Sequence, residues 1–447
     1  MGTTQAIAEW ILGTGYKDFD TALVKYTKDL CLNALGSSLA GAMMPAGRST
    51  VAYVKERGGP KEAGVIGGGF RTSLEYAALA NGTTSHVTEL EDDAHPEDCY
   101  TCGVLPAVFT LGDRLRISGE QAIEGFILGY EIAVKLSGKC PEMLNRGLLT
   151  DSYFGAVGVA GMAAKMLGLD VAGITNALSI AASQACGLLQ QHGAGAHLLE
   201  SGFSCRNGIS AALLAKHGLT GKLDILERPK GLCEAAAGVS DLGDLDLNRY
   251  RLKKGLVMKK YPACSLQHTM IRGFLELKKE HGISADDIES IQVDVHAGFM
   301  SFNDYHHPEN YMEAPFALPH AIAVCFMEDS VFLDGYTEEK VHDPKIHAFR
   351  EKVNMVLHPE WDRPGVAGKE YPICVRLKDG RELNKVCPGG AEVITLSDED
   401  IMGRYMGCAL RALSRQKAGQ AAEMILGLEK IKDISPLMDI LTFTDKS

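Results

Sequence analysis

Long windows rich in alanine, leucine, isoleucine and methionine constrain the fold of this chain most strongly. As far as about residue 260, apolar residues recur at three- and four-residue spacing between glycine and proline breaks, which indicates helices. The clearest windows are 20–39, 121–136, 154–167 and 174–189. Alanine and glycine dominate their faces and permit close helix approach. We therefore expect an all-helical domain with a dense, buried core.

The pattern changes after Tyr261-Pro262. Ser265 is a plausible N-cap for a helix that ends at Gly282. Residues 291–295 alternate like a half-buried strand, and 373–377 and 382–386 flank a hairpin turn at 378–381. Residues 397–400 then open a return to helix over 401–431.

These patterns predict a mostly α fold with an inserted α/β domain. The large all-helical domain takes in residues 1–261 and 396–447, and the smaller, lid-like α+β domain takes in 262–395. The cleft between two such domains is the default position for a binding site.

Composition places limits on partners and compartment. The chain has 447 residues, 46% hydrophobic and 23% charged, which is ordinary for a soluble two-domain protein. Its formal net charge of -12 argues against a nucleic-acid-binding surface. No apolar run reaches membrane-spanning length. Twelve scattered cysteines, without an N-terminal leader, indicate free thiols in a reducing cytoplasm.

Motifs for metals and cofactors are weak in this sequence. Cys99-Tyr-Thr-Cys102 is the only C-x-x-C, and no second pair accompanies it at zinc-site spacing. His306-His307-Pro308 resembles a metal-binding fragment but has no third ligand at useful spacing, so an exposed loop is expected. P-loop, H-E-x-x-H and G-x-S-x-G motifs are missing, and Gly64 to Gly69 is interpreted as an ordinary loop. We therefore expect no metal and no organic cofactor.

The stretch from Asn81 to Pro96 concentrates acids and imidazoles. As a helix it would place His86, Glu89 and Asp93 on one face, at i, i+3 and i+7. Carboxylates beside imidazoles favour acid/base chemistry, although a solvated acidic helix end has the same pattern. His95 precedes Pro96 and is expected in a loop, where Asp93 can orient it.

Several segments together resemble the MmgE/PrpD family, in family order across most of the chain. The matching pieces are Ala78-Leu-Ala-Asn-Gly-Thr83 with His86 and the acidic run, Val104-Leu-Pro106, Ala181-Ala-Ser-Gln-Ala-Cys-Gly187, Arg206-Asn-Gly208, Lys259-Lys-Tyr-Pro262 with His268, and Phe316-Ala-Leu-Pro319. The resemblance implies a helical domain carrying a lid-like α/β insertion, a homodimer, and lyase or isomerase chemistry on small polycarboxylates without a cofactor.

Departures from the family pattern leave substrate and reaction open. Glu89 stands for the first aspartate of the acidic run, Asp93 for a threonine, and Cys99 for the second catalytic histidine, with His95 nearby. Leu149 stands where a histidine is typical, His197 where a lysine is typical, with Glu200 at the position of the following histidine. His320 stands where a tyrosine is typical. Lys259 and His268 keep their identities.

From these residues we predict two groups. The catalytic group is Asp93, His95, Lys259, His268 and Glu89; the substrate-binding group is His197, His320, Arg206, Cys99 and His86. Lys259 is expected to meet a carboxylate and stabilise developing charge, whereas a structural Arg206–Glu200 ion pair and a helix-capping Asn207 are expected nearby.

The predicted function is a cofactor-independent lyase, a dehydratase or decarboxylase, that abstracts a proton alpha to a carboxylate of a small di- or tricarboxylate. The alternatives are an epimerase or isomerase of a small dicarboxylate, favoured by Leu149, and a non-catalytic metabolite-binding or scaffold protein.

Overall fold

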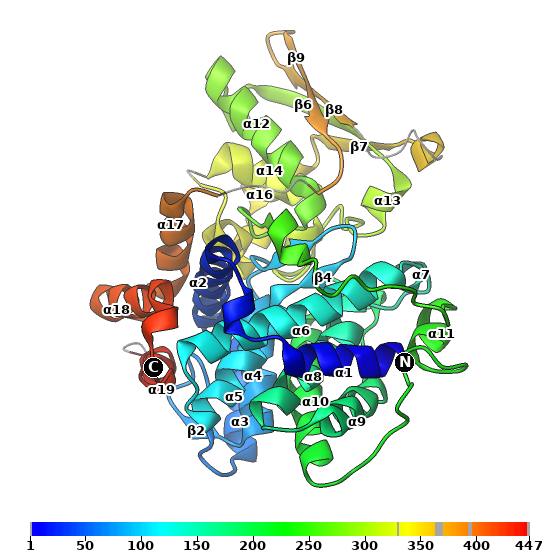
Figure 1. Cartoon of the computed structure of the whole chain (residues 1–447). Coiled ribbons are helices and arrows are strands. Elements are labelled where there is room, and N and C mark those ends of the chain that lie inside the picture. The colour runs from blue at the N-terminus through cyan, green and yellow to red at the C-terminus, as the bar shows by residue number, and fades with distance from the viewer. Residues whose placement is uncertain (1, 329, 363–369, 392–395, 445–447) are drawn as a thin grey trace. The chain divides into compact units, whose positions relative to one another are not determined.

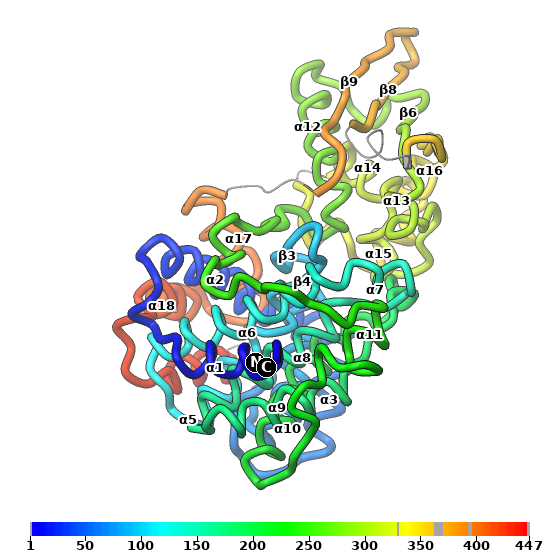
Figure 2. Tube along the Cα trace, turned by 45° about the vertical axis from the view of Figure 1, so that its right-hand side comes forward, coloured from blue at the N-terminus to red at the C-terminus, as the bar shows by residue number. Residues whose placement is uncertain are grey.

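The computed structural model describes residues 2–328, 330–362, 370–391 and 396–444. The chain divides into two compact units. Unit 1 comprises residues 1–191, 195–258 and 395–447, and unit 2 comprises 192–194 and 259–394. Figures 1 and 2 show the elements of both. None of the described helices has the length and apolarity needed to cross a membrane.

Unit 1 is helical, with α8 packed between α6 and α10, and α4 packed on α10 and α2 (Figure 1). Its helices are α1 (Thr3–Gly13), α2 (Thr21–Met43), α3 (Pro45–Arg57), α4 (Leu74–His86), α5 (Leu105–Leu115), α6 (Gly119–Lys139), α7 (Glu142–Asn145), α8 (Thr150–Met166), α9 (Val171–Ala182), α10 (Gly195–Lys216), α11 (Leu232–Ala237), α17 (Asp398–Ala409), α18 (Arg415–Leu426) and α19 (Ser435–Thr442).

Short strands interrupt the helices of unit 1, which the sequence prediction missed. β1 (Ala63–Gly64) pairs with β2 (Arg71–Thr72), and β3 (Asp92–Ala94) lies between β4 (Cys99–Tyr100) and β5 (Val257–Met258), all antiparallel. Segments of two or three residues carry no readable alternation. The sheet of β3, β4 and β5 matters because it holds Asp93 in place.

Two predicted helices differ from the structure. The window 174–189 ends early, because α9 stops at Ala182 and Ser183 is its C-cap. The single helix over 401–431 is two helices, α17 and α18, because Ser414 caps a new helix through the backbone N–H of Lys417. Asp20 caps α2 through the N–H of Leu23, at the predicted start of the first window.

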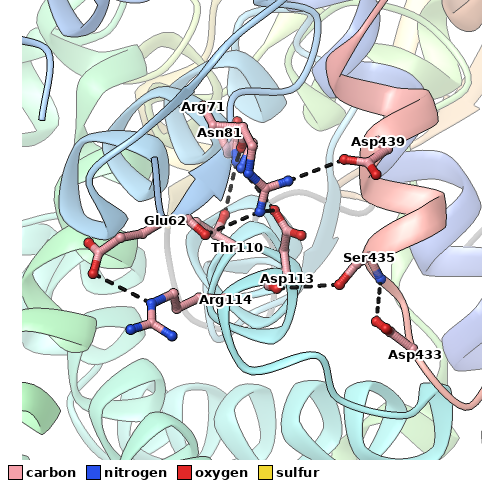
Figure 3. A network of polar contacts seen from close by, with 10 residues as sticks. Glu62, Arg71, Asn81, Thr110, Asp113, Arg114, Asp433, Ser435 and Asp439 are labelled. Carbon is pink, nitrogen blue, oxygen red and sulfur yellow. Dashed lines mark hydrogen bonds and ion pairs between the residues drawn. The ribbon is translucent and has the colours of Figure 1, made fainter. Parts of the chain in front are cut away.

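A polar network fastens the C-terminal helix α19 to the core of unit 1 (Figure 3). Asp113 on α5 accepts from the N–H of Gly64 at 2.9 Å and pairs with Arg71 at 2.9 Å. Arg71 also contacts Asp439 on α19 at 3.2 Å. Asn81 donates to the carbonyl of Gly64 and to Thr110. This residue of the family-like motif therefore connects α4 to β1 and α5.

Unit 2 is an α/β unit. Its sheet has the order β7-β6-β8-β9, with β6 and β7 parallel and the other pairs antiparallel. The predicted strand and hairpin are confirmed. The elements are β6 (Ile288–Val295), β7 (Val353–Leu357), β8 (Glu370–Leu377), β9 (Glu382–Pro388), α12 (His268–His281), α13 (Ala297–Met300), α14 (Leu318–Met327), α15 (Glu338–Val341) and α16 (Pro344–Arg350).

Helix α12 packs against β9 and α14, and its apolar face joins one core with the sheet. Its start differs from the prediction: Ser265 begins a short 3₁₀ turn, and the α-helix starts at His268. Its end at Gly282 is as predicted, because Gly282 takes a positive φ of 61°, which glycine adopts without strain.

Glycines allow α4 and α10 to approach closely. A Cβ on Gly202 would lie 2.3 Å from Thr83 Oγ1 and 2.5 Å from the carbonyl of Leu79. We expect Gly202→Ala to destabilise the protein by about 1–3 kcal/mol, because the backbone must move. Gly403→Ala on α17 is the matched control, since its Cβ meets no atom within 4 Å. Thermal unfolding of both variants checks this; equal melting temperatures would contradict it.

Candidate active site

The close contact of α4 with α10 places the first group of polar side chains in unit 1. His86 is the last residue of α4, and His197 lies in the first turn of α10. Their rings have centroids 4.6 Å apart. Both side chains are buried, at 1% and 2% exposure, so these polar groups sit in a low-dielectric interior.

Glu89 lies between the two histidines. Its Oε1 is 3.8 Å from Nε2 of His86 and 3.9 Å from Nε2 of His197. The other ring nitrogens have partners too: Nδ1 of His86 is 3.1 Å from Ser201 Oγ, and Nδ1 of His197 is 3.1 Å from Glu200 Oε2. Each imidazole is therefore oriented from one side and presents Nε2 to the same carboxylate.

The predicted helical face of His86, Glu89 and Asp93 is wrong. Helix α4 ends at His86, Glu89 has a left-handed φ of 51°, and Asp93 lies on strand β3. Asn33 on α2 donates to the carbonyl of Leu90 and to Asp92, and buried Arg404 also donates to that carbonyl. These contacts from distant segments favour the irregular path over another helical turn.

Asp93 and His95 form the second group. Asp93 Oδ2 is 2.5 Å from Nε2 of His95. His95 lies in the turn between β3 and β4, as expected from the proline that follows it. The Asp93 side chain is 1% exposed, whereas that of His95 is 27% exposed. A buried carboxylate thus orients an imidazole that reaches solvent, which is an arrangement suited to proton transfer.

The backbone of this turn is anchored. In the register of the sheet, Asp93 lies opposite Tyr100 on β4 and Val257 on β5. Arg251 donates to the carbonyl of His95 at 2.9 Å and forms a two-pronged contact with Glu97 at 2.8 and 3.0 Å. A catalytic imidazole needs such a fixed position.

Cys99 is fully buried on β4. Burial raises the pKa of its thiol well above the ordinary value, and the neighbouring carboxylates of Asp151 and Asp93 raise it further. The thiol is therefore neutral at physiological pH and is a weak hydrogen-bonding group.

Arg206 and Asn207 lie in the middle of α10, so the predicted helix cap at Asn207 is wrong. The expected Arg206–Glu200 ion pair is also wrong. Arg206 instead donates to Asn207 Oδ1 at 2.9 and 3.0 Å and stacks on Phe203. Positions six apart on a helix point to different faces, which explains the difference.

Unit 2 carries the other three predicted residues, and each is buried. Lys259 directly follows β5 and is 4% exposed, His268 begins α12 and is 1% exposed, and His320 on α14 is fully buried. His268 Nε2 is 3.2 Å from the carbonyl of Ala263, and His320 Nε2 is 2.9 Å from the carbonyl of Gly335.

Burial lowers the pKa of His320 to about 4. An unfolded histidine titrates near 6.5, so between these values the unfolded chain takes up the proton and the folded chain does not. The contribution of neutral His320 to the free energy of unfolding is therefore fully present above pH 6.5. It falls by roughly 3 kcal/mol as the pH drops toward 4. Urea unfolding midpoints measured from pH 4.5 to 7 should decrease less with falling pH in His320→Gln than in wild type. The exposed control His342→Gln should behave as wild type does. An equal decrease of the midpoint in all three proteins would contradict this.

Sequence reasoning missed Ser201 and Asp151. Ser201 follows His197 at i+4, so helical spacing alone places both on one face. Asp151 at the start of α8 accepts from the N–H of Tyr100 at 3.1 Å. Burial raises its pKa well above the ordinary value, and the carboxylates of Asp98, Asp93 and Glu200 raise it further. No local sequence signal indicates that Asp151 contacts the strand that carries Cys99 and Tyr100.

The His86–Glu89–His197 cluster also has the composition of a metal site. Its three ligand atoms lie within 4.8 Å of one another. Two imidazoles, each oriented through its Nδ1 atom, and one carboxylate are ligands that zinc and related divalent ions accept. The cluster can therefore either act without a metal, through its imidazoles and carboxylate, or hold a metal ion.

Comparison with known families decides the relationship. The model of the MmgE/PrpD N-terminal domain matches residues 5–243, and that of the MmgE/PrpD C-terminal domain matches residues 261–430. The chain belongs to the MmgE/PrpD family. The resemblance inferred from the ordered motifs is thereby confirmed.

Individual members of the family are distant but mostly cover the whole chain. Cis-aconitate decarboxylase of Aspergillus terreus is 24% identical over all of this chain and 97% of its own length. Cis-aconitate decarboxylase of Mus musculus is 24% identical over 98% of this chain and 93% of its own. Mitochondrial 2-methylcitrate dehydratase of Yarrowia lipolytica is 31% identical, over 25% of this chain and 22% of its own.

Proposed function

We propose that this protein is a lyase that acts on a small di- or tricarboxylate by removing a proton alpha to a carboxylate. Relatives named as a decarboxylase and a dehydratase support an enzyme of the lyase class. The observation that carries the proposed mechanism is the 2.5 Å contact between buried Asp93 and partly exposed His95.

In this mechanism His95 takes the proton from the substrate carbon. The ionised Asp93 beside it stabilises the imidazolium that forms and fixes the ring. In a dehydration the enolate-like intermediate then expels the hydroxyl group on the neighbouring carbon, which takes the proton from the His95 imidazolium and leaves as water. In a decarboxylation the bond to the carboxylate breaks in place of the C–H bond: carbon dioxide leaves, the bonding electrons stay on the substrate as an enolate-like carbanion, and protonated His95 gives that carbanion its proton. Lys259, retained from the family motif, supplies positive charge for a carboxylate of the substrate.

The His86–Glu89–His197 cluster has a binding role in this proposal. A histidine at the position of a typical lysine recognises a carboxylate by hydrogen bonding. Both Nε2 atoms face the Glu89 carboxylate, at 3.8 and 3.9 Å from its Oε1. His268 remains a predicted catalytic residue, and His320, Arg206 and Cys99 remain predicted substrate-binding residues.

The test is an assay panel of citrate-like, aconitate-like and amino-dicarboxylate substrates, followed by proton NMR in deuterated water. Formation of an alkene, or loss of carbon dioxide, on a polycarboxylate is the expected result. Deuterium uptake without elimination would instead indicate the alternative epimerase or isomerase. Inactivity throughout, with the Asp93→Asn variant indistinguishable, would favour a metabolite-binding or scaffold protein.

We propose that turnover needs no cofactor, because the Asp93–His95 pair and Lys259 supply base and charge. The His86–Glu89–His197 geometry favours a second candidate, a metal-assisted lyase, in which these three residues would hold a divalent ion that would supply Lewis-acid chemistry at a substrate carboxylate. Assaying protein stripped with EDTA separates the two. Unchanged kcat supports the metal-free lyase; loss that zinc or manganese restores in wild type but not in His86→Ala supports the second.

We also propose a cytoplasmic homodimer. All twelve cysteines are free thiols, as a reducing compartment requires. Leu214, Leu219 and Leu223 are 42–59% exposed around the end of α10, and the N–H of Leu219 donates to the carbonyl of Leu214. Exposed leucines within one short stretch of the chain favour contact with a second copy.

We expect a dimer in sedimentation at micromolar concentration. Leu219→Glu should shift it toward monomer, because a carboxylate in an apolar interface is costly to desolvate. Leu357→Glu, an equally exposed leucine in unit 2 at 48%, is the control and should remain dimeric. A wild-type monomer near 48 kDa would contradict the proposal.

A further inference from the structure

Three potential ligands meet on unit 2, and one of them, His307, is forty residues or more from the other two in sequence. His307 lies in the loop after α13, His347 lies on α16, and Glu351 is the C-cap of α16. The third ligand that the His306-His307-Pro308 fragment lacks locally therefore comes from another element. Positions 347 and 351 are four apart in sequence and share one side of the helix end.

The geometry of these side chains is convergent. Nδ1 of His307 is 3.3 Å from Oε1 of Glu351, and the rings of His307 and His347 are 6.2 Å apart at an interplanar angle of 24°. One ligand atom from each of the three residues lies within 4.8 Å of the others. Donor atoms around a single zinc ion, with bonds near 2.0–2.2 Å, lie about 3–3.5 Å apart. Rotation of exposed side chains closes that difference.

We propose that His307, His347 and Glu351 form a surface site for one divalent transition-metal ion. Two imidazole nitrogens and one carboxylate oxygen suit zinc, nickel, cobalt or copper, whereas magnesium and calcium prefer sites built from oxygen alone. His307 and Glu351 have side chains that are each 52% exposed, so water completes the coordination.

A metal at this position links the loop around His307 to the end of α16. Glu351 supplies negative charge that the ion neutralises. An ion that binds only the folded unit stabilises it by mass action. This site does not rest on the proposed lyase function, and none of its residues belongs to the predicted catalytic groups.

The test uses the full chain, stripped of metal and titrated calorimetrically with zinc chloride. The buried His86–Glu89–His197 cluster is a second zinc candidate, so the variants are compared within a His86→Ala background. We expect one equivalent of zinc in that background, and at least a tenfold weaker affinity after His347→Ala or Glu351→Gln. His342→Ala, an exposed histidine on the same unit, is the matched control and should bind as the background does.

The three side chains substituted outside the buried cluster, His342, His347 and Glu351, are exposed, so the unliganded variants should have the same melting temperature as their background. Magnesium chloride at the same concentration should give no heat. Equal zinc affinity in the background and His347→Ala proteins would overturn the proposal and leave His307–Glu351 as an ion pair. The same holds if no zinc binds. Lyase activity should be unchanged by His347→Ala, which separates this outcome from failure of the proposed function.

Discussion

The Asp93→Asn variant should lose roughly 10²–10⁴-fold in kcat while it keeps its fold. Asparagine matches the shape of aspartate, but it removes the charge that lies 2.5 Å from His95 Nε2. Without that charge the imidazolium formed during proton abstraction loses its stabilisation, and the amide can hold the ring in the wrong tautomer. Steady-state kinetics and circular dichroism measure the two effects.

A double-mutant cycle with His95→Gln gives the sharper measurement. If the two side chains act as one unit, the double variant should be no slower than the slower single variant. Glu97→Gln is the control from the same turn, because Glu97 contacts Arg251 and its variant measures what a weaker anchor of the turn costs by itself. Additive losses in the cycle, or a kcat for Asp93→Asn equal to that of Glu97→Gln, would contradict the assignment.

The parts of this fold that sequence predicts are those that local patterns determine. Helix α2 begins where Asp20 caps it, α12 ends where Gly282 takes a positive φ, and the hairpin of β8 and β9 surrounds its Asp-Gly turn. Cap, stop and turn chemistry all act within a few residues. The early end of α9 shows that an apolar window alone sets no boundary.

The path from His86 to Asp93 shows why the site itself was harder to predict. Helical spacing favoured one continuous face, yet β5, from far along the chain, pairs with Asp92 and Asp93 as a strand. Asn33 and Arg404, also distant in sequence, fix Leu90 and the residues beside it. Such non-local contacts override local propensity and leave no periodic signal.

The ordered family motifs identified residues of the candidate site, but the motif match alone does not determine what each side chain contacts. Within α10, His197 faces Glu89 and Glu200, whereas Arg206 contacts Asn207 on another part of the helix. A motif match thus gave the correct segment, but the helical angle decides which side chains share a face. The Asp93–His95 pair needed only proximity along the chain, and the structure brings these two side chains into contact.

Lys259→Ala should lower kcat/KM at least 100-fold, with most of the loss in kcat. The reason is that a lysine ammonium that meets charge developing on the substrate stabilises the transition state more than the ground state. Lys259 is 4% exposed, and a long charged side chain is rarely buried unless a structural or chemical demand retains it. Lys259→Arg should recover little, because the planar guanidinium differs in shape and reach.

The neighbouring residue supplies the control for this experiment. Lys260 has the same chemistry but is exposed, so Lys260→Ala removes an equal charge at nearly the same position along the chain. Kinetics and urea midpoints of both alanine variants separate catalysis from folding. Loss of stability without loss of kcat in Lys259→Ala would assign this lysine a structural role. Equal kcat/KM for the two variants would remove it from the proposed mechanism, and the charge on the substrate would then have to be met by the His86–Glu89–His197 cluster.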